Sequence, residues 1–447
     1  MRNSKSRADG IDRAGESAEQ PDATTNRCAN ESQQSFTSEI DRNAQASYLL
    51  LFLQVAYPAV FAVLMTTTYG VGEYGQFAPL LAVTSGLAII VDFGSMLFAP
   101  RWIGRCIRPK VRVRRVAAML LWRMCIGTFA TSFVLIFIKK LVPAVDPSVA
   151  GALVSMSVLA VVLSPQSFDY ALQRLARFAV PSLIVRIAAA AAMAIFAATG
   201  YPSVFLVLIY LGSSLVVSLL TAHWEALHAT IDRRLVRTLR TTARRSVAHG
   251  LASVAANLSL VIPHIVAGAM LNPVQTGALH LGGMLVRAAC SVAEPLAASV
   301  YAALSRVGAQ QAIIPSIAVQ AKYRRIQITV ACLASLGLMM VSGVLAVQTI
   351  FDIKNSFLVA EIVGIQTFLP LLVSISQIAM LELLLAQPGT HTHAKINATG
   401  ACILAIACVA VAGTWGVRGL AAATVAFEIG MTFAYTLLAN RVRMSNQ

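Results

Sequence analysis

The sequence predicts an all-α polytopic membrane protein with about twelve transmembrane helices, divided six plus six. Of its 447 residues, 57% are hydrophobic and only 12% are charged, whereas soluble domains carry about 25% charged residues. Apolar stretches long enough to cross a bilayer as helices recur along the chain. The basic residues between these stretches are distributed unevenly, as in multi-pass membrane proteins.

The apolar stretches define the spans in order. Most have the length of about 17–25 residues that crosses the hydrocarbon core as a helix. Turn-forming sequences such as TGYPS and LNPVQT separate neighbouring stretches. The predicted spans are 47–66, 76–98, 116–138, 149–165, 179–198, 203–222, 250–270, 277–300, 326–350, 359–385, 399–413 and 419–440.

Lysine and arginine indicate the orientation of the chain. With the amino terminus in the cytoplasm, the even-numbered loops and the carboxyl end hold 22 of these residues, and the odd-numbered loops hold four. Because cytoplasmic loops are enriched in basic residues, this bias predicts that both termini are cytoplasmic. It also explains the net charge of +16 without a nucleic-acid partner, and it makes anionic lipid headgroups the expected neighbours of these loops.

The first 45 residues differ from the rest of the chain. They are polar, mixed in charge and poor in aromatic residues, which predicts a disordered cytoplasmic tail. No short apolar segment with a cleavage site precedes the first span, so we expect no cleavable signal peptide. The first helix is therefore expected to direct membrane insertion.

Motifs for catalysis or cofactor binding are missing from the sequence. The seven cysteines form no CxxC pair, so neither a disulfide framework nor a zinc site is expected. His391 and His393 stand two residues apart without a nearby carboxylate or cysteine, which makes a poor metal site. We find no nucleophile elbow, Walker A or HExxH pattern. The sequence therefore predicts no enzyme activity, no cofactor and no metal.

The two halves of the membrane region correspond to each other. Asp92 in span two and Glu294 in span eight each lie 17 residues after a glycine, Gly75 or Gly277. Transporters are often built from such repeats, with the binding site between them. We predict a tail over 1–45, a six-helix bundle over 46–222, a cytoplasmic linker over 223–248, a second six-helix bundle over 249–440 and a cytoplasmic end over 441–447.

Two stretches resemble a known family. YGVGEYGQFAPLLAVTSGLAIIVDFGSMLFAPRWIGR, at 69–105, resembles the first loop and second helix of Wzx-type polysaccharide flippases, which belong to the multidrug/oligosaccharidyl-lipid/polysaccharide exporter superfamily. GVRGLAAATVAFEIGMTFAYTLLANRVR, at 416–443, is similar to the last helix of that family. The resemblance covers about residues 46–443, and the long polar tail departs from it. The matching residues are Gly70, Glu73, Tyr74, Gly75, Asp92, Phe93, Gly94, Gly419 and Glu428.

The resemblance implies a fold and a function. The implied fold is two helical bundles in a V around a central cavity, which is often cationic in this family. The implied function is to move undecaprenyl-diphosphate-linked oligosaccharide to the periplasmic leaflet of the bacterial inner membrane, for biosynthesis of exopolysaccharide, O-antigen or another cell-surface polysaccharide. The implied partners are this lipid-linked substrate, the membrane, a polysaccharide polymerase and the export machinery.

Three arginines fall within predicted spans: Arg123 in span three, Arg186 in span five and Arg287 in span eight. A charge at the bilayer centre costs at least about 2.5 kcal/mol, so it indicates a functional site. We predict that all three bind anionic groups of the substrate. Two alternatives stay open, an ion pair between Arg287 and Glu294 and snorkelling of Arg123 and Arg186 toward the cytoplasm.

The acidic residues within spans are predicted to serve the same site. Asp92 and Glu294 either contact the sugar or carry a proton, or they orient arginines across the cavity. Glu428, in the middle of span twelve, is the candidate coupling residue. The roles of three further polar residues within spans stay open: His264, Glu361 and Glu382.

Two other functions are alternatives to the flippase. One is a cation-coupled exporter of small drugs from the same superfamily. Many cavity carboxylates with few arginines would favour it, whereas three arginines lie within the spans here. A membrane polysaccharide polymerase usually needs a sizeable loop outside, whereas the longest one here has about ten residues. The sequence favours the flippase, with drug export as the first alternative.

Overall fold

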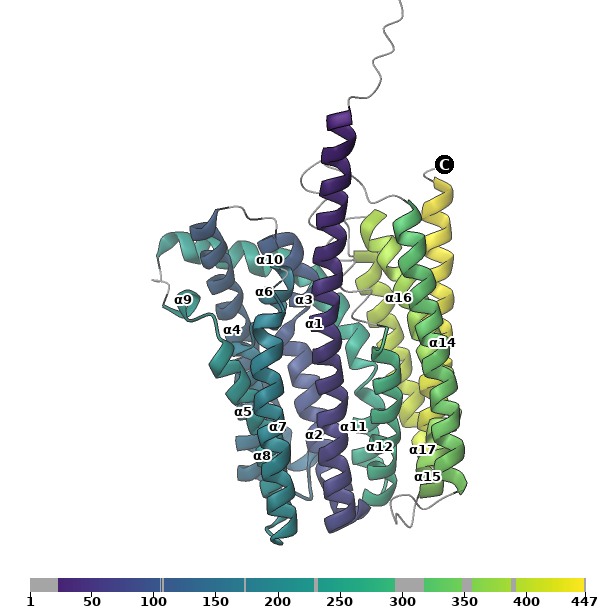
Figure 1. The fold of residues 1–447 in the computed structure, drawn as a ribbon. Helices are drawn as coiled ribbons and strands as arrows, with labels where there is room; N and C mark the ends of the chain where they lie inside the picture. The colour runs from purple at the N-terminus through teal and green to yellow at the C-terminus, as the bar shows by residue number, and fades with distance from the viewer. Residues whose placement is uncertain are drawn as a thin grey trace, which may run out of the picture.

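The described part of the chain is helical, and its long helices run along one axis (Figure 1). The structure is a computed structural model that describes residues 23–104, 106, 108–172, 174–228, 232–293, 317–347, 356–386 and 391–445. Within these ranges, nine helices are long and apolar enough to cross a membrane. The predicted all-α, multi-pass fold is confirmed, and the other predicted spans are formed by shorter or interrupted helices.

Helix α1 (Ala23–Tyr69) begins well before its membrane span, Gln45–Tyr69. The structure thus describes residues 23–45 as helix, where the sequence predicts a disordered tail over 1–45, and residues 1–22 lie outside the described residues. The physical reason lies in the sequence, because no glycine or proline occurs between Ala23 and Pro58. Extending an existing helix costs far less than nucleating a new one.

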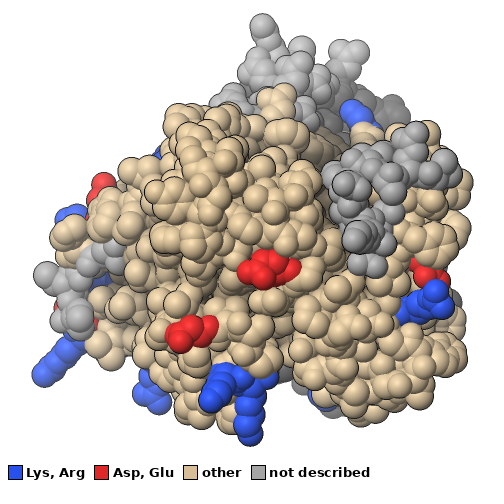
Figure 2. Space-filling view, turned by 90° about the horizontal axis from the view of Figure 1, so that it is seen from below, with Lys and Arg blue, Asp and Glu red and all other residues tan. Residues whose placement is uncertain are grey.

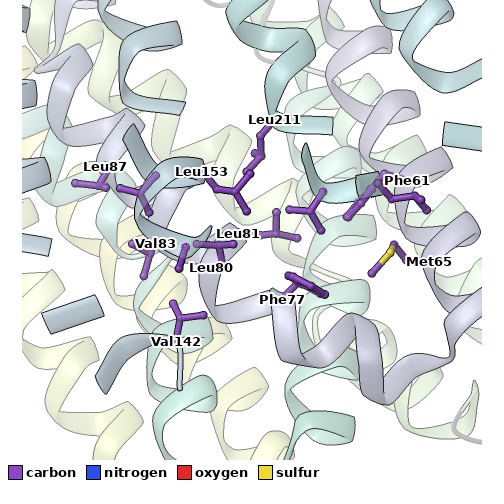
Figure 3. Close-up of a cluster of buried hydrophobic side chains, with 14 of the residues drawn as sticks. Phe61, Met65, Phe77, Leu80, Leu81, Val83, Leu87, Val142, Leu153 and Leu211 are labelled. Carbon is purple, nitrogen blue, oxygen red and sulfur yellow. The ribbon is translucent and has the colours of Figure 1, made fainter. Parts of the chain in front are cut away.

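The first half of the molecule is a bundle of helices with its own core. In addition to α1 it contains α2 (Val71–Asp92), α4 (Pro109–Leu141), α5 (Pro147–Leu163), α7 (Ala176–Ala198) and α8 (Ser203–Thr221). Phe61, Met65, Phe77 and Leu80 are buried in this core together with Leu153 (Figure 3). Large apolar side chains thus hold α1, α2 and α5 against one another.

Helix α2 ends at Asp92, six residues before the predicted end of span two. The next two residues adopt left-handed backbone conformations, with φ of 42° at Phe93 and 70° at Gly94. Such a pair of residues cannot continue a right-handed helix. The chain then forms α3 (Ser95–Ala99) and the π-helix η1 (Pro100–Gly104). Asp92 therefore lies at the end of a helix, where the sequence predicted a continuous span.

The second half forms a separate bundle. Its described helices are α10 (Arg233–Leu258), α11 (Ile262–Met270), α12 (Pro273–Ser291), α14 (Ile317–Val347), α15 (Ser356–Ile365), α16 (Leu369–Ala386) and α17 (His391–Ser445). Leu279, Ile362, Leu404 and Leu420 are fully buried in its core. Predicted span seven is broken between α10 and α11, and predicted span ten between α15 and α16.

The segment predicted as a linker, 223–248, is largely helical. It contains the short α9 (Trp224–Leu227) and the first part of α10. Asp232 caps α10, since its Oδ1 accepts a hydrogen bond of 2.6 Å from the backbone N–H of Leu235. An N-cap of this kind satisfies a backbone donor that the helix itself leaves free.

Predicted spans eleven and twelve are the two arms of α17. Gly416, with φ of 58° and ψ of −138°, interrupts the helix between them. A Cβ atom placed on Gly419 would lie 3.0 Å from the Cβ of Val411. Residues eight apart in a straight helix are about 12 Å apart along its axis, so the chain folds back at Gly416.

The described ends of the chain lie at the same end of the molecule, which we call the tail end (Figure 1). Helices α9 and α10 also begin there. The opposite end carries few charged side chains on its visible surface (Figure 2). On the outside of the bundles, Phe129, Ile136 and Ile406 are 76%, 75% and 73% exposed. Apolar side chains exposed in this way are expected to contact lipid.

The two halves touch closely near the opposite end, where α2 crosses α12. A Cβ atom on Gly75 would overlap the carbonyl oxygen of Pro273, and one on Gly277 would lie 2.9 Å from the carbonyl oxygen of Val71. Small residues permit this close approach of two membrane helices. The two glycines that relate the halves in the sequence therefore face each other in the structure.

Candidate functional site

A cavity of about 1030 Å³ lies between the two halves. Residues of α1, α2, α4, α5, α7 and α8 line it from one half, and residues of α10, α11, α12, α16 and α17 from the other. Its lining extends from Tyr74 and His280 near the opposite end to Asp92, Phe178 and Ser253 nearer the tail end. The glycine contact of α2 with α12 lies beyond Tyr74, toward the opposite end.

The predicted site residues meet at this cavity. Those that the structure describes all line it: Asp92, Arg123, Arg186, Arg287 and Glu428. Glu294, also predicted to bind substrate, lies outside the described residues. The alternative ion pair of Arg287 with Glu294 falls outside them as well.

Arg123 of α4 is buried and its donors are well occupied. Its Nη2 donates to Asp92 Oδ1 and, at 2.7 Å, to Ser167 Oγ. Its Nε donates to Ser95 Oγ at 3.1 Å, and its Nη1 donates to the carbonyl oxygen of Ser164 at 2.9 Å. This one guanidinium joins the end of α2 to the start of α3 and to the connection between α5 and α6 (Gln166–Ala171).

A phenyl ring completes the surroundings of Arg123. The guanidinium carbon lies 4.9 Å from the ring centre of Phe168, in α6 (Gln166–Ala171). The left-handed turn at Phe93 and Gly94 is what brings Ser95 back toward Asp92, and the hydroxyl of Ser95 donates to the Asp92 carbonyl oxygen. Asp92 keeps part of its side chain, 28%, exposed to the cavity.

Arg186 of α7 has a very different environment. It forms no hydrogen bond or ion pair with a described residue, and its Nε is buried without a partner. Its guanidinium carbon lies 5.5 Å from the ring centre of Tyr57. Tyr57 in turn stacks on Tyr210 at 5.2 Å, and Phe61 stacks on Tyr210 at 4.4 Å. Arg186 therefore stands beside aromatic rings instead of a carboxylate.

Arg287 of α12 approaches the same tyrosine from the other half. Its only hydrogen bond to a described residue runs from Nε to the carbonyl oxygen of Gly283, at 3.3 Å, within its own helix. No described residue forms an ion pair with it. Tyr210 interacts electrostatically with both Arg186 and Arg287. Two cations, one from each half, thus face one region of the cavity without a paired anion among the described residues.

Two histidines lie near Arg287, toward the glycine contact. His280 Nδ1 and the hydroxyl of Tyr74 share a hydrogen bond of 2.6 Å. The ring of His264 lies 5.3 Å from that of His280, edge to face. From the sequence alone the role of His264 stays open, and neither His280 nor Tyr210 is predicted to belong to the site. A histidine inside a predicted span was the available signal, since polar residues within spans mark functional sites.

The acids of the second half divide into two kinds. Glu428 of α17 lines the cavity and makes no ion pair with a described residue. Glu361 of α15 accepts a hydrogen-bonded ion pair of 2.8 Å from Arg418, whose side chain is 62% exposed. The side chain of Glu382 lies outside the described residues. Glu428 is therefore the one free acid that the described lining offers against Arg186 and Arg287.

Comparisons with known proteins identify the fold. No protein-family model and no curated protein matches the chain significantly. Among solved structures it is similar to an outward-facing multidrug resistance MATE family transporter of the MOP superfamily, with a TM-score of 0.64 and 16% sequence identity. That alignment covers 91% of this chain and 96% of the transporter.

Two further structures share this fold. A MOP superfamily transporter from Pyrococcus furiosus, described as having a binding pocket of reversed polarity, aligns with a TM-score of 0.62 and 13% identity over 91% of this chain and 95% of that one. The lipid II flippase MurJ, in an inward closed conformation, aligns with a TM-score of 0.63 and 11% identity over 89% and 87%. The chain thus has the fold of MOP superfamily transporters, which includes drug transporters and a flippase of a lipid-linked substrate.

Proposed function

We propose that this protein is a flippase that moves undecaprenyl-diphosphate-linked oligosaccharide across the bacterial inner membrane for cell-surface polysaccharide biosynthesis. Both termini lie in the cytoplasm, so the tail end is cytoplasmic and the glycine contact is periplasmic. The two halves rock about the cavity, which exposes it to each side in turn. A polysaccharide polymerase and the export machinery act on the delivered product.

Two unpaired arginines in the cavity support an anionic substrate. Arg186 and Arg287, from opposite halves, line one cavity and form no ion pair with a described residue. Guanidinium groups bind phosphate through paired, charge-assisted hydrogen bonds. The carboxylate of Asp92 is already engaged by Arg123, which leaves Glu428 as the one free acid of the described lining. The described lining therefore offers more unpaired positive than negative charge, which favours an anionic substrate such as a diphosphate.

The other predicted site residues have supporting roles in this proposal. Arg123 and Asp92 stiffen the cytoplasmic mouth of the cavity, where Asp92 also presents its exposed oxygen to the sugar. Glu294 stays a proposed substrate contact at the matching position of the second half. Glu428 stays the proposed coupling residue, because an acid inside a span can carry a proton.

Transport in vesicles tests this function. Purified protein is reconstituted into liposomes that hold undecaprenyl diphosphate bearing a short fluorescent oligosaccharide, and a membrane-impermeant quencher reports movement between leaflets. We expect Arg287→Ala to slow this movement at least about tenfold, because a hydrogen bond to a charged group contributes about 1.5–3 kcal/mol. Arg418→Ala is the matched control, since Arg418 is engaged by Glu361, and it should move the lipid at the wild-type rate.

Drug export is the second candidate, because the fold is shared with multidrug transporters and Glu428 offers a carboxylate to a cationic drug. The same liposomes loaded with ethidium separate the two functions. Ethidium transport that Glu428→Gln abolishes and Arg287→Ala spares, with no movement of the labelled lipid, would replace the flippase by a drug exporter.

A further inference from the structure

His264 and His280, which we call the imidazole pair, lie where the two halves meet. His280 belongs to α12, and its Nδ1 bonds the hydroxyl of Tyr74 in α2 at 2.6 Å. This hydrogen bond crosses from one half to the other. Gly75, the residue after Tyr74, packs closely against the backbone of α12. Separation of α2 from α12 therefore breaks the bond and uncovers His280.

The second imidazole is buried and incompletely bonded. His264 is 7% exposed and His280 is 8% exposed. Nδ1 of His264 has no hydrogen-bond partner among the described residues. A Cβ atom on Gly283 would lie 2.7 Å from Cε1 of the His264 ring, so this ring fills the space above a glycine of α12. An orphaned buried nitrogen in a native site calls for an explanation.

A cation faces the imidazole pair. Arg287 lies one turn after Gly283 on α12, and its Nε donates to the Gly283 carbonyl oxygen. Its charge acts on both imidazoles. Like charges in a poorly solvated site repel strongly. A proton on either imidazole is thus opposed in the closed arrangement by burial and by Arg287.

Among the described residues, no carboxylate on the neighbouring helices forms an ion pair with the imidazole pair. Helix α2 contributes the neutral hydroxyl of Tyr74, and α8 that of Tyr210. Glu73, also on α2, accepts a hydrogen bond of 2.8 Å from Ser203 of α8. On α17, Glu428 lines the same cavity but forms no ion pair with either imidazole. On α15, Glu361 is engaged by Arg418.

The elements nearer the tail end also leave the pair without an anion. On α2 and α4, Asp92 and Arg123 engage each other. On α1, Tyr57 stacks on Tyr210. The arginines of α10 that are described are exposed, as Arg244 and Arg245 are. On α16, the side chain of Glu382 lies outside the described residues.

We propose that the imidazole pair is a proton-binding site whose occupancy separates α2 from α12 and opens the cavity at the end opposite the tail. This inference rests on the alternating access of the proposed function. A proton binds more strongly to the open arrangement, in which water solvates the charged imidazole. By linkage, protonation shifts the population toward that arrangement.

A bound anionic substrate should favour protonation of the imidazole pair. A diphosphate held by Arg287 offsets the positive charge that opposes protonation. Loading of the anionic substrate and protonation of the pair then favour each other, as two linked ligands must. The substrate-loaded cavity opens most readily when a proton has been taken up.

A distance measurement without any substrate tests the proton site. Nitroxide spin labels are placed by Thr199→Cys and Thr414→Cys, two exposed positions, one on each half, in a chain whose seven native cysteines are replaced. Double electron–electron resonance in lipid nanodiscs reports their separation between about pH 8 and about pH 5.5, the range in which imidazole titrates. We expect the ratio of long to short distances to rise on acidification, by up to about tenfold for each pKa unit by which the two arrangements differ.

Three variants define the outcome. His264→Gln and His280→Gln should each keep the wild-type distances at about pH 8 and lose most of the response to acid. His228→Gln is the matched control, because its imidazole is exposed and bonds only the carbonyl oxygen of Trp224, and it should respond as the wild type does.

The proposal is overturned if the wild-type distances are the same at both pH values, or if the double variant His264→Gln with His280→Gln still responds. Since no lipid-linked ligand is present, this result is independent of the substrate assay. A pH response without movement of the labelled lipid would leave the proton site standing while removing the proposed flippase function.

Discussion

Arg123 and Arg287 line the same cavity, yet their surroundings differ completely. Arg123 meets a carboxylate, two serine hydroxyls, a backbone carbonyl and a phenyl ring. Arg287 bonds one carbonyl of its own helix and otherwise faces tyrosines and histidines. Both look alike in the sequence, as lone arginines in apolar spans.

The difference separates two reasons for placing a cation in a membrane protein. The cost of burying Arg123 is offset by its partners within one half, so it holds that half together. The cost of burying Arg287 is not offset by any described anion, so a ligand is needed to complete its surroundings. We infer that satisfied arginines stabilise this fold and that unsatisfied ones bind its cargo.

Removal of Arg123 should give the largest loss of stability. Arg123→Ala leaves Asp92, Ser95 and Ser167 without their shared donor, and breaking a buried pair in this way costs about 3 kcal/mol. Thermal unfolding of the purified protein in detergent measures the loss. Arg287→Ala is the contrasting variant, and it should change the unfolding temperature little or raise it, because it removes a poorly paired buried charge. Equal destabilisation by both variants would mean that Arg123 and Arg287 have the same structural role.

An added methyl group at the glycine contact should have the next largest effect. Gly75→Ala places a Cβ atom into the carbonyl oxygen of Pro273, and such overpacking typically costs about 1–3 kcal/mol. We expect it to push α2 and α12 apart and to lengthen the distance between labels at Thr199 and Thr414. Gly72→Ala is the control, because its new Cβ atom would lie 4.0 Å from Val274 Cγ2, and it should keep the wild-type distance.

Neutralisation of Asp92 should have a smaller effect than removal of its partner. Asp92→Asn keeps an oxygen acceptor for Arg123 but loses the charge, so we expect a loss of about 1–2 kcal/mol in unfolding free energy. Transport of the labelled lipid should fall only modestly, because a loss of this size leaves most of the protein folded and the amide keeps an oxygen that can accept from the sugar. If Asp92→Asn abolished transport and left stability unchanged, the charge of Asp92 would serve transport and not the stability that its pair with Arg123 is expected to give.

The sequence predicts a large part of this fold. Hydropathy and the basic loops indicate the spans, and the two glycines that anchor the repeat, Gly75 and Gly277, are in contact in the structure. Sequence patterns capture these features because they arise from local helical periodicity and from the bilayer. The break after Asp92 cannot be predicted from the sequence, because Phe93 is an apolar residue in a left-handed conformation that glycine usually adopts.

The site is only partly predictable, for a different reason. Positions of arginines within spans can be read from the sequence, but their partners come from distant segments. Arg123 is 41 residues from Ser164 and 44 from Ser167, and Tyr74 is 206 from His280. Whether a buried charge is satisfied depends on such tertiary contacts, which helical spacing does not encode.

Binding of undecaprenyl diphosphate shows whether the two unpaired arginines hold the substrate. Its affinity is measured by microscale thermophoresis for the wild type, Arg186→Ala, Arg287→Ala and the double variant, with Arg418→Ala as the control. We expect each single variant to weaken binding about 10–100-fold and the double variant to weaken it further. Arg418→Ala should bind as the wild type does. Unchanged affinity in the double variant would contradict the claim that the two unpaired arginines hold the diphosphate.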